Sequence, residues 1–122
     1  MNQLTNLFKT LSDETRLRII ALLFQEELCV CEISGILNIP QPTVSKGLSK
    51  LRDLNLVEDT RKEKFIYYKL KEDPALLRLI LMDIFHDLSP YPQLLKDKEG
   101  LTTKWIYTDS NNTLDPSILL KK

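Results

Sequence analysis

Residues 27–54 constrain the possible fold of this 122-residue chain more than any other stretch. Apolar residues at helical spacing form two runs, interrupted by Asn-Ile-Pro at residues 38–40. Two helices joined by so short a turn predict a helix-turn-helix, whose second helix enters the major groove of DNA. Pro40 and Pro42 place the start of this recognition helix near Gln41, because proline is tolerated in a first helical turn.

Polar side chains are expected at the amino end and on the exposed side of the recognition helix. Glutamine pairs with adenine, hydroxyl groups with several base edges or phosphate, and lysine with guanine or phosphate. The predicted DNA-binding residues of this helix are Gln41, Thr43, Ser45, Lys46 and Lys50. Gly47 lies inside the same helix at a cost of roughly 1 kcal/mol relative to alanine. A close approach of DNA or of a neighbouring helix would each account for it.

A pair of strands follows the recognition helix. Residues 56–59 and 65–70 are strand-like, the second rich in aromatic and β-branched residues, and residues 60–64 form a charged turn. This pattern predicts a β-hairpin, the wing of a winged helix. Its basic side chains would reach the backbone or minor groove of DNA, although solvated loop charges are the alternative. They are Arg61, Lys62 and Lys64.

The formal net charge is zero, but the charges are unevenly distributed. Residues 41–71 hold eight basic and four acidic side chains, whereas the segments before and after each hold two more acidic than basic ones. The positive charge therefore coincides with the segment where phosphate contacts are expected. The alternative is a mixed, solvated surface.

Helices are predicted on both sides of this motif, over residues 3–11, 13–24 and 73–88. The last is apolar on more than one face, so it needs burial on two sides. A homodimer, in which two readers face a roughly palindromic operator, would supply that burial. The predicted interface consists of Leu4, Leu7, Phe8, Leu77, Ile80, Leu81 and Ile84. Arg16 and Arg18 are expected on the solvated surface.

The predicted fold class is mainly α with a small β-hairpin, in one winged helix-turn-helix domain. Residues 1–90 would form the DNA-binding and dimerisation domain, and residues 91–122 a C-terminal extension. Within the extension, residues 104–108 are expected to be a strand or an anchor on the body, and residues 109–113 a loop. No apolar run reaches the roughly 20 residues of a membrane span. The first residues lack a signal-peptide pattern, so we expect a cytoplasmic protein with no membrane contact.

Cys29 and Cys31 precede the helix-turn-helix and are the only cysteines in the sequence. Structural disulfides are rare in a reducing cytoplasm, so metal binding or redox chemistry is the better use of such a pair. Thiolate is a soft ligand that suits soft ions. The alternative is two buried apolar cysteines at a helix start.

The segments LSDETRLRII, ELCVCEI, PQPTVSKGLSKLRDLNLV and FIYYKL together resemble the ArsR/SmtB family of metal- and metalloid-responsive repressors, over about residues 4–88. The resemblance implies a dimeric winged helix, not an enzyme, that holds operator DNA until an inducer binds. It also implies that Cys29 and Cys31 bind trivalent arsenic or antimony, with no organic cofactor. The family's third arsenic-binding cysteine falls on Ser34. The residues near the family's zinc site, Asp83, His86 and Asp87, have the wrong spacing.

Two thiolates leave the three-coordinate shell of arsenic one ligand short, so a cellular thiol, water or Ser34 would complete it. Residues two apart on a helix do not face each other. We therefore expect that binding one atom would bend or unwind the backbone at the cysteines and disturb the support of the recognition helix. The predicted function is a repressor released by arsenite or antimonite.

Other functions are compatible with the same residues. The same repressor would respond to cadmium or lead, or its thiols to oxidant or persulfide. A third possibility is a module that uses the fold for protein contacts. An enzyme is not expected, because the sequence has one histidine and no recognisable nucleophile–base spacing.

Overall fold

The computed structural model describes residues 2–108, and in this range the chain is mainly helical with one small sheet. The fold class predicted from the sequence is confirmed. None of the helices in residues 2–108 is long and apolar enough to cross a membrane. The elements, in chain order, are α1 (Asn2–Leu11), α2 (Glu14–Gln25), β1 (Leu28–Cys29), α3 (Val30–Leu37), α4 (Gln41–Asp53), β2 (Val57–Lys62), β3 (Phe65–Leu70), α5 (Ala75–His86), α6 (Pro92–Gly100) and the 3-10 turn η1 (Leu101–Thr103).

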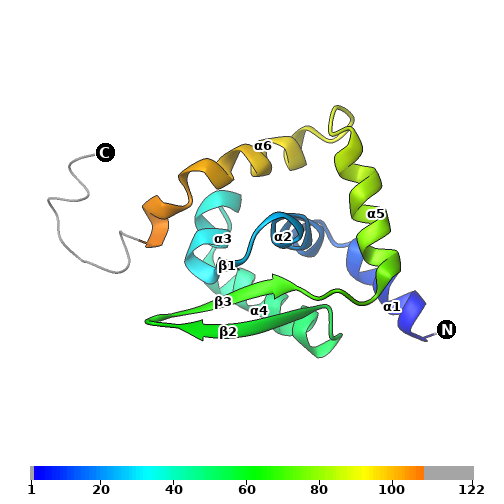
Figure 1. Ribbon diagram of the computed structural model, residues 1–122, viewed down its shortest axis with the longest axis horizontal. Coiled ribbons are helices and arrows are strands. Elements are labelled where there is room, and N and C mark those ends of the chain that lie inside the picture. Colours follow the sequence, from blue (N-terminus) through cyan, green and yellow to red (C-terminus); the bar gives the residue numbers. More distant parts are fainter. Residues whose placement is uncertain (1, 109–122) are drawn as a thin grey trace, which may run out of the picture.

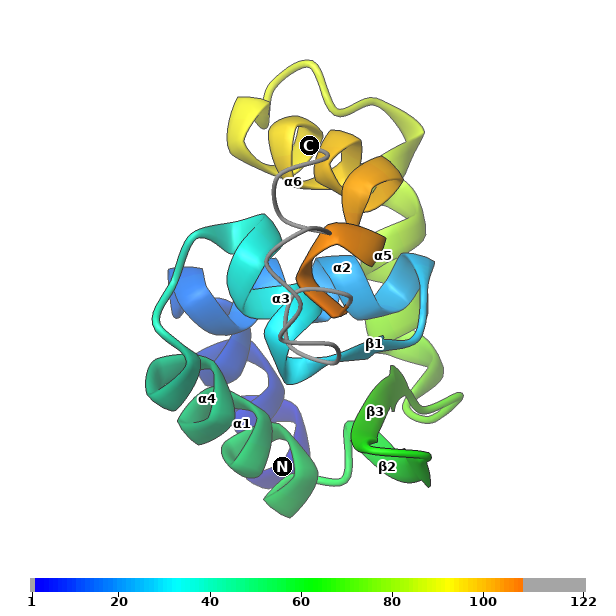
Figure 2. The ribbon, with the colours of Figure 1, turned by 90° about the vertical axis from the view of Figure 1, so that its left-hand side faces the viewer.

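Helices α3 and α4 form the predicted helix-turn-helix. Asn38 ends α3 in the left-handed conformation, with φ of 57°, and α4 begins three residues later, at Gln41 behind Pro40. Asparagine tolerates this conformation better than most residues, which explains the sharp stop. Figure 2 shows α4 and the hairpin on the same side of the molecule, with α6 at the opposite end.

The hairpin forms the predicted wing, but its turn is shorter than expected. Strands β2 and β3 pair through Lys62 and Phe65, so that only Glu63 and Lys64 connect them. Glu63 has a φ of 56°. The sequence did not predict strand β1, which pairs with β3 and makes the sheet order β1-β3-β2.

Helix α2 lies at the centre of the core, surrounded by the other elements (Figure 1). Its start agrees with the prediction, because the Asp13 carboxylate caps it by accepting from the Arg16 N–H at 2.9 Å. The core side chains of α2 and α4 are almost fully enclosed, and burying each one stabilises the fold by about 1.5–3 kcal/mol. They include Ile19, Ile20, Leu22, Val44, Leu48 and Leu51.

Part of the predicted dimer interface belongs to the core of the single chain. Leu7, Leu77 and Leu81 are 5%, 1% and 0% exposed, because one side of α5 and one apolar residue of α1 pack inward. Those three side chains are not available to a second subunit. The exposed apolar side chains of these two helices are Leu4, Phe8, Leu76, Leu79 and Met82.

The segment after residue 90 continues into structure that the sequence did not predict. Helix α6 packs on α2 and α3. Residues 105–108 are helical, so the strand alternative is wrong and the anchor alternative holds. The Tyr107 ring lies directly over Gly35, where an added Cβ would fall 2.2 Å from ring atom Cδ1. The loop predicted at 109–113 lies outside the described residues, and the division at residue 90 stays a prediction.

The Arg18 side chain is only 13% exposed, contrary to the expectation that it lies on the solvated surface. Its Nε donates to Asp97 Oδ2 at 2.9 Å, and its Nη2 donates to Asp97 Oδ1 at 3.0 Å and to the Leu37 carbonyl at 3.1 Å. Its partner Asp97 is 3% exposed and also accepts from Gln93. This ion pair joins α2 to α6. It was invisible in the sequence because the two residues are 79 positions apart.

Candidate nucleic-acid interface and thiol site

The outward face of α4 carries all of the predicted recognition-helix residues. Val44, Leu48 and Leu51 face the core and leave the opposite side of the helix to solvent. The predicted side chains are exposed on that side: Gln41, Thr43, Ser45, Lys46 and Lys50. Their exposure leaves each of them accessible to DNA, and the contacts themselves stay predictions.

Gly47 is explained by helix packing. A Cβ at this position would lie 3.1 Å from Ile19 Cδ1 of α2, so the glycine lets α4 approach α2 closely. Of the two alternatives for Gly47, the neighbouring helix is the one observed.

A groove of about 440 Å³ runs between the amino end of α2 and the outward face of α4. Its lining includes Lys46 and Lys50 together with Arg16. The Arg16 Nε is buried and has no hydrogen-bond partner, and it lies 3.8 Å from Asp13 Oδ2. The groove also holds the carboxylates of Asp13 and Asp53, so its basic side chains exceed its acidic ones by one, and this small excess favours an anionic ligand. Sequence reasoning placed Arg16 on the general surface because its neighbours in the groove are about 30 residues away.

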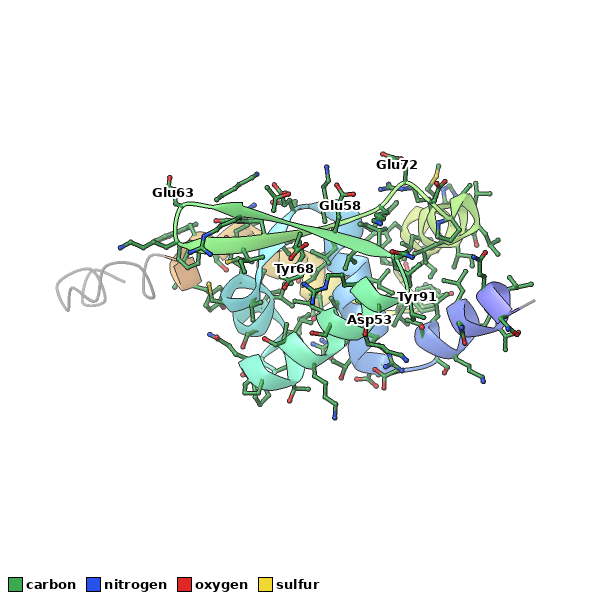
Figure 3. All side chains as sticks on the ribbon, turned by 90° about the horizontal axis from the view of Figure 1, so that it is seen from below. Asp53, Glu58, Glu63, Tyr68, Glu72 and Tyr91 are labelled. Atoms are coloured by element: carbon green, nitrogen blue, oxygen red, sulfur yellow. The ribbon has the colours of Figure 1, made fainter. Side chains whose placement is uncertain are left out.

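The three basic residues predicted for the wing are all exposed near its tip. Lys62 already has partners in the chain: its Nζ donates to Glu27 Oε1 at 2.5 Å and lies 5.4 Å from the centre of the Tyr67 ring. Figure 3 shows Glu63 at the outer end of the hairpin, with Tyr68 on the helix side of the sheet. The predicted wing contacts of Arg61, Lys62 and Lys64 with DNA stay predictions.

The two cysteines lie side by side at the junction of β1 and α3. Their Sγ atoms are 3.1 Å apart, and the residues are 1% and 8% exposed. Cys29 is the N-cap of α3 with extended backbone, at φ of −92° and ψ of 169°, while Cys31 lies in the first turn. Two sulfurs bound to one atom at about 2.3 Å, the Zn–S distance, cannot be more than about 4.6 Å apart. The observed separation is within that limit.

This geometry corrects the expectation that the backbone must bend or unwind. That expectation assumed that both cysteines belong to one helix. Because Cys29 precedes the helix as its cap, its side chain turns back toward Cys31, and the sulfurs converge without unwinding. The expectation failed because Cys29 belongs to β1, a two-residue strand that sequence patterns cannot reveal.

The buried surroundings distinguish the two thiols. The hydrogen bond between them, together with burial, raises the pKa of Cys29, while the same bond lowers the pKa of Cys31. Either sulfur can donate in this contact, so loss of one proton leaves a thiolate that the remaining S–H stabilises. The Cys29 backbone N–H donates to Glu32 Oε1 at 3.1 Å, which fixes the start of α3.

The thiol site touches both parts of the predicted DNA-binding surface. Cys29 pairs with Tyr67 and Leu28 with Tyr68 across β1 and β3, so the site shares a sheet with the wing. Burial, followed by the negative charge of Glu32, raises the pKa of Tyr67. Helix α3 also packs against α4. A displacement of the cysteines can therefore reach the DNA-binding surface through β3 of the wing and through the contact between α3 and α4.

Other metal-binding residues do not converge on this site. No group of three or more His, Cys, Asp or Glu side chains in residues 2–108 is arranged to hold a metal ion. The Ser34 hydroxyl donates to the Ile39 carbonyl at 2.5 Å, at the far end of α3. His86 ends α5 and is exposed.

Comparison with known proteins agrees with this arrangement. Residues 13–59 match the family model described as "Bacterial regulatory protein, arsR family". The chain is 44% identical over 64 residues to the arsenic resistance transcriptional regulator ArsR1 of Pseudomonas putida, covering 52% of this chain and 50% of the relative. It is 43% identical over 65 residues to the cadmium resistance regulator CadC of Listeria innocua, covering 52% and 55%. The chain thus spans about half the length of these curated relatives.

Solved structures extend the similarity over more of the chain. The transcriptional repressor BigR of Xylella fastidiosa is 35% identical, with a TM-score of 0.63, over 70% of this chain and 85% of that one. The homodimeric winged helix-turn-helix domain of a possible ArsR-family regulator from Mycobacterium bovis is 30% identical, with a TM-score of 0.61, over 70% and 80%.

Proposed function

Because the chain belongs to the arsR family of bacterial regulatory proteins, we propose that it is a cytoplasmic transcriptional repressor released from operator DNA by trivalent arsenic or antimony. The observation that carries this proposal is the pair of Sγ atoms 3.1 Å apart at the start of α3. They are the only thiols in the sequence, and they lie where the wing and the helix-turn-helix meet.

The proposed DNA-binding surface consists of the outward face of α4, the wing and the groove beside α2. Figure 2 shows α4 and the hairpin facing the same side, as reading one duplex requires. In this arrangement the amino end of α4 enters the major groove, and Arg16, Lys50 and the wing cations contact phosphates. Arg16 is added to the predicted set because its Nε is buried without an acceptor.

Release requires that the inducer and the operator DNA favour different conformations of the protein. A soft atom held by both sulfurs replaces the hydrogen bond between Cys29 and Cys31 and pushes on β1. Strand β1 carries that displacement to β3, and Glu27, two residues before Cys29, holds Lys62 of the wing. The inducer needs only a higher affinity for the DNA-free conformation, and a tenfold difference corresponds to about 1.4 kcal/mol.

A titration of the protein on the DNA upstream of its own gene tests this function. In fluorescence anisotropy, arsenite and antimonite are expected to release the DNA at lower concentrations than cadmium, while zinc has little effect. Affinity should fall steeply with salt, as phosphate contacts require. Binding that does not depend on salt would favour a protein-contact module, and DNA that stays bound at saturating arsenite and antimonite would contradict the proposal.

The alternative inducers keep the same site. The similarity to a cadmium resistance regulator favours a soft divalent ion as the second candidate. The thiols also lie close enough together for oxidation to a disulfide, because their Sγ atoms are 3.1 Å apart. Mass spectrometry after arsenite, cadmium or polysulfide distinguishes an ion adduct from a persulfide or a disulfide.

The lysines of α4 give the first prediction. We expect Lys50→Ala to lower DNA affinity at low salt and to reduce the slope of log affinity against log salt by about 0.9 for each phosphate that the variant no longer neutralises. The control is Lys96→Ala at an exposed lysine of α6, the helix that Figure 2 shows at the opposite end of the molecule from α4. Equal slopes for the two variants would show that Lys50 does not contact a DNA phosphate.

The second prediction concerns the dimer. We propose that the exposed apolar side chains of α1 and α5 form the interface with a second copy, as the homodimeric relative suggests. Leu79 and Met82 are 61% and 58% exposed, so a charged residue there disturbs association but not the core. Leu79→Glu is expected to convert the dimer to monomer in sedimentation equilibrium. Leu95→Glu, at an exposed leucine of α6, is expected to leave the dimer intact.

A further inference from the structure

An arginine of α5 binds the backbone at the base of the wing. The Arg78 Nε donates to the Lys71 carbonyl at 3.1 Å, and its Nη2 donates to the Leu70 carbonyl at 3.1 Å. Leu70 is the last residue of β3, and the Lys71 N–H donates to the Leu56 carbonyl, just before β2. Figure 1 shows β3 leading into α5 through a short connection, which these bonds close.

Apolar side chains supply further attachments of α5 to the body. Leu77 and Leu81 are almost fully enclosed in the core, and the Phe85 ring lies 5.5 Å from the Phe24 ring of α2. Apolar burial is not directional, so these contacts leave the rotation of α5 and its position along its axis less constrained. Hydrogen bonds from a charged donor are directional and strong. Arg78 therefore adds a contact that favours one orientation of α5 relative to the wing.

We propose that Arg78 is a positioning residue that fixes the angle between the dimerisation helix and the DNA-binding surface. In the proposed dimer, α5 supplies the exposed Leu79 and Met82 to the interface, whereas α4 and the wing contact DNA. A rotation of α5 against the wing would change the separation of the two recognition helices. That separation must match half-sites that lie a whole number of DNA turns apart. The inference rests on the proposed function, because it concerns the same dimer on its operator.

The charge of Arg78 has a second partner that provides a matched control. Glu72 Oε2 lies 3.5 Å from the Arg78 Nε, but the Glu72 side chain is 91% exposed, so solvent screens this ion pair. Figure 3 shows Glu72 on the connection between the wing and α5. Glu72→Gln removes the ion pair and leaves the two backbone bonds, whereas Arg78→Met removes both bonds and keeps an apolar stem. Arg78→Lys keeps the charge without the planar fork of donors.

Distances between the two subunits measure the orientation without DNA. Spin labels are attached to the full-length chain at Ser49→Cys, on the exposed face of α4, in a background with serine at Cys29 and Cys31. Electron–electron double resonance then reports the separation of the recognition helices. With Arg78 present, one narrow distance distribution is expected. Arg78→Met is expected to broaden it, Arg78→Lys to broaden it less, and Glu72→Gln to leave it unchanged.

DNA binding gives a second result that a loss of stability alone would not produce. A full operator, located by footprinting upstream of the gene, engages both subunits, whereas a fragment with one half-site engages one. Arg78→Met is expected to lower affinity for the full operator by about tenfold, or about 1.4 kcal/mol, and for the half-site by less than about twofold. Urea unfolding checks that each variant is folded, and Arg78→Lys carries the test if Arg78→Met does not fold.

The outcomes separate this inference from the proposed function. A distance distribution that is the same with and without Arg78 would overturn the inference, and so would equal losses of affinity for the full operator and the half-site. Neither result would affect the release of DNA by arsenite. A labelled protein without any defined distance between subunits would contradict the proposed dimer and this inference with it. A dimer whose distances depend on Arg78 but which binds no DNA would overturn the proposed function and leave the positioning role intact.

Discussion

Replacing Asp97 with alanine is expected to lower the free energy of unfolding by about 3–5 kcal/mol, the usual result of removing one partner of a buried ion pair. Asp97 is 3% exposed and receives two bonds from the Arg18 guanidinium, at 2.9 and 3.0 Å. Those bonds raise the pKa of Arg18, and an arginine stays charged even when its partner is gone. The loss arises because the Arg18 guanidinium, on a side chain that is only 13% exposed, is left without its anion. Urea unfolding followed by circular dichroism measures it.

An exposed ion pair of the same chain supplies the control. Glu58 and Lys69 face each other on the wing at 3.3 Å, with side chains 44% and 52% exposed. Glu58→Ala is expected to change stability by less than about 1 kcal/mol, since solvent screens such pairs. A double replacement of Arg18 and Asp97 by methionine and leucine should recover part of the loss. If Asp97→Ala costs no more than Glu58→Ala, the junction between α2 and α6 contributes little.

Loss of either thiol is expected to raise the arsenite concentration for half-release of DNA by about a hundredfold, because a two-point attachment becomes a single one. Cys29→Ser is the sharper variant of the two. Serine is a favoured N-cap residue, so α3 keeps its cap and the fold should persist while one sulfur is lost. DNA affinity without arsenite should therefore stay close to that of the unaltered protein. Anisotropy on the operator gives both quantities.

Ser34→Ala provides the matched control for the cysteine variants. The Ser34 hydroxyl is engaged with the Ile39 carbonyl, so its removal should leave the arsenite response nearly unchanged. A large effect of Ser34→Ala on the response would make Ser34 the third ligand. An unaltered response in Cys29→Ser would instead exclude the thiol pair as the sensor.

The sequence predicted those parts of the fold whose signals are local. The interruption at residues 38–40 separated α3 from α4, and the aromatic run of β3 indicated the wing. Features that depend on distant partners were missed. Strand β1 has two residues and exists through its pairing with β3, and helix α6 has a weakly patterned sequence that is stabilised by Asp97 and the contact between Gly100 and Ile36.

The candidate site was predicted at the level of residues and mispredicted at the level of geometry. Both cysteines and the cations of α4 were proposed from their residue types and spacing, and what they bind stays a prediction. The contact between the sulfurs was not predicted, since it depends on where α3 begins, and helix ends are the least certain part of a sequence-based assignment. One residue of difference in that start decides whether the cysteines diverge or meet.

Helix α3 is fastened at both ends, which limits how it can respond to a ligand. Its first residues are tied to the wing strand through the pairing of Cys29 with Tyr67, and its last carbonyl, at Leu37, is held by Arg18. A helix held at both ends cannot rotate as a rigid body about either end. A displacement at the sulfurs must therefore bend the neighbouring sheet or strain the hydrogen bond from Arg18 to the Leu37 carbonyl. Removing that hydrogen bond would weaken the effect of the inducer on DNA binding without altering the cysteines.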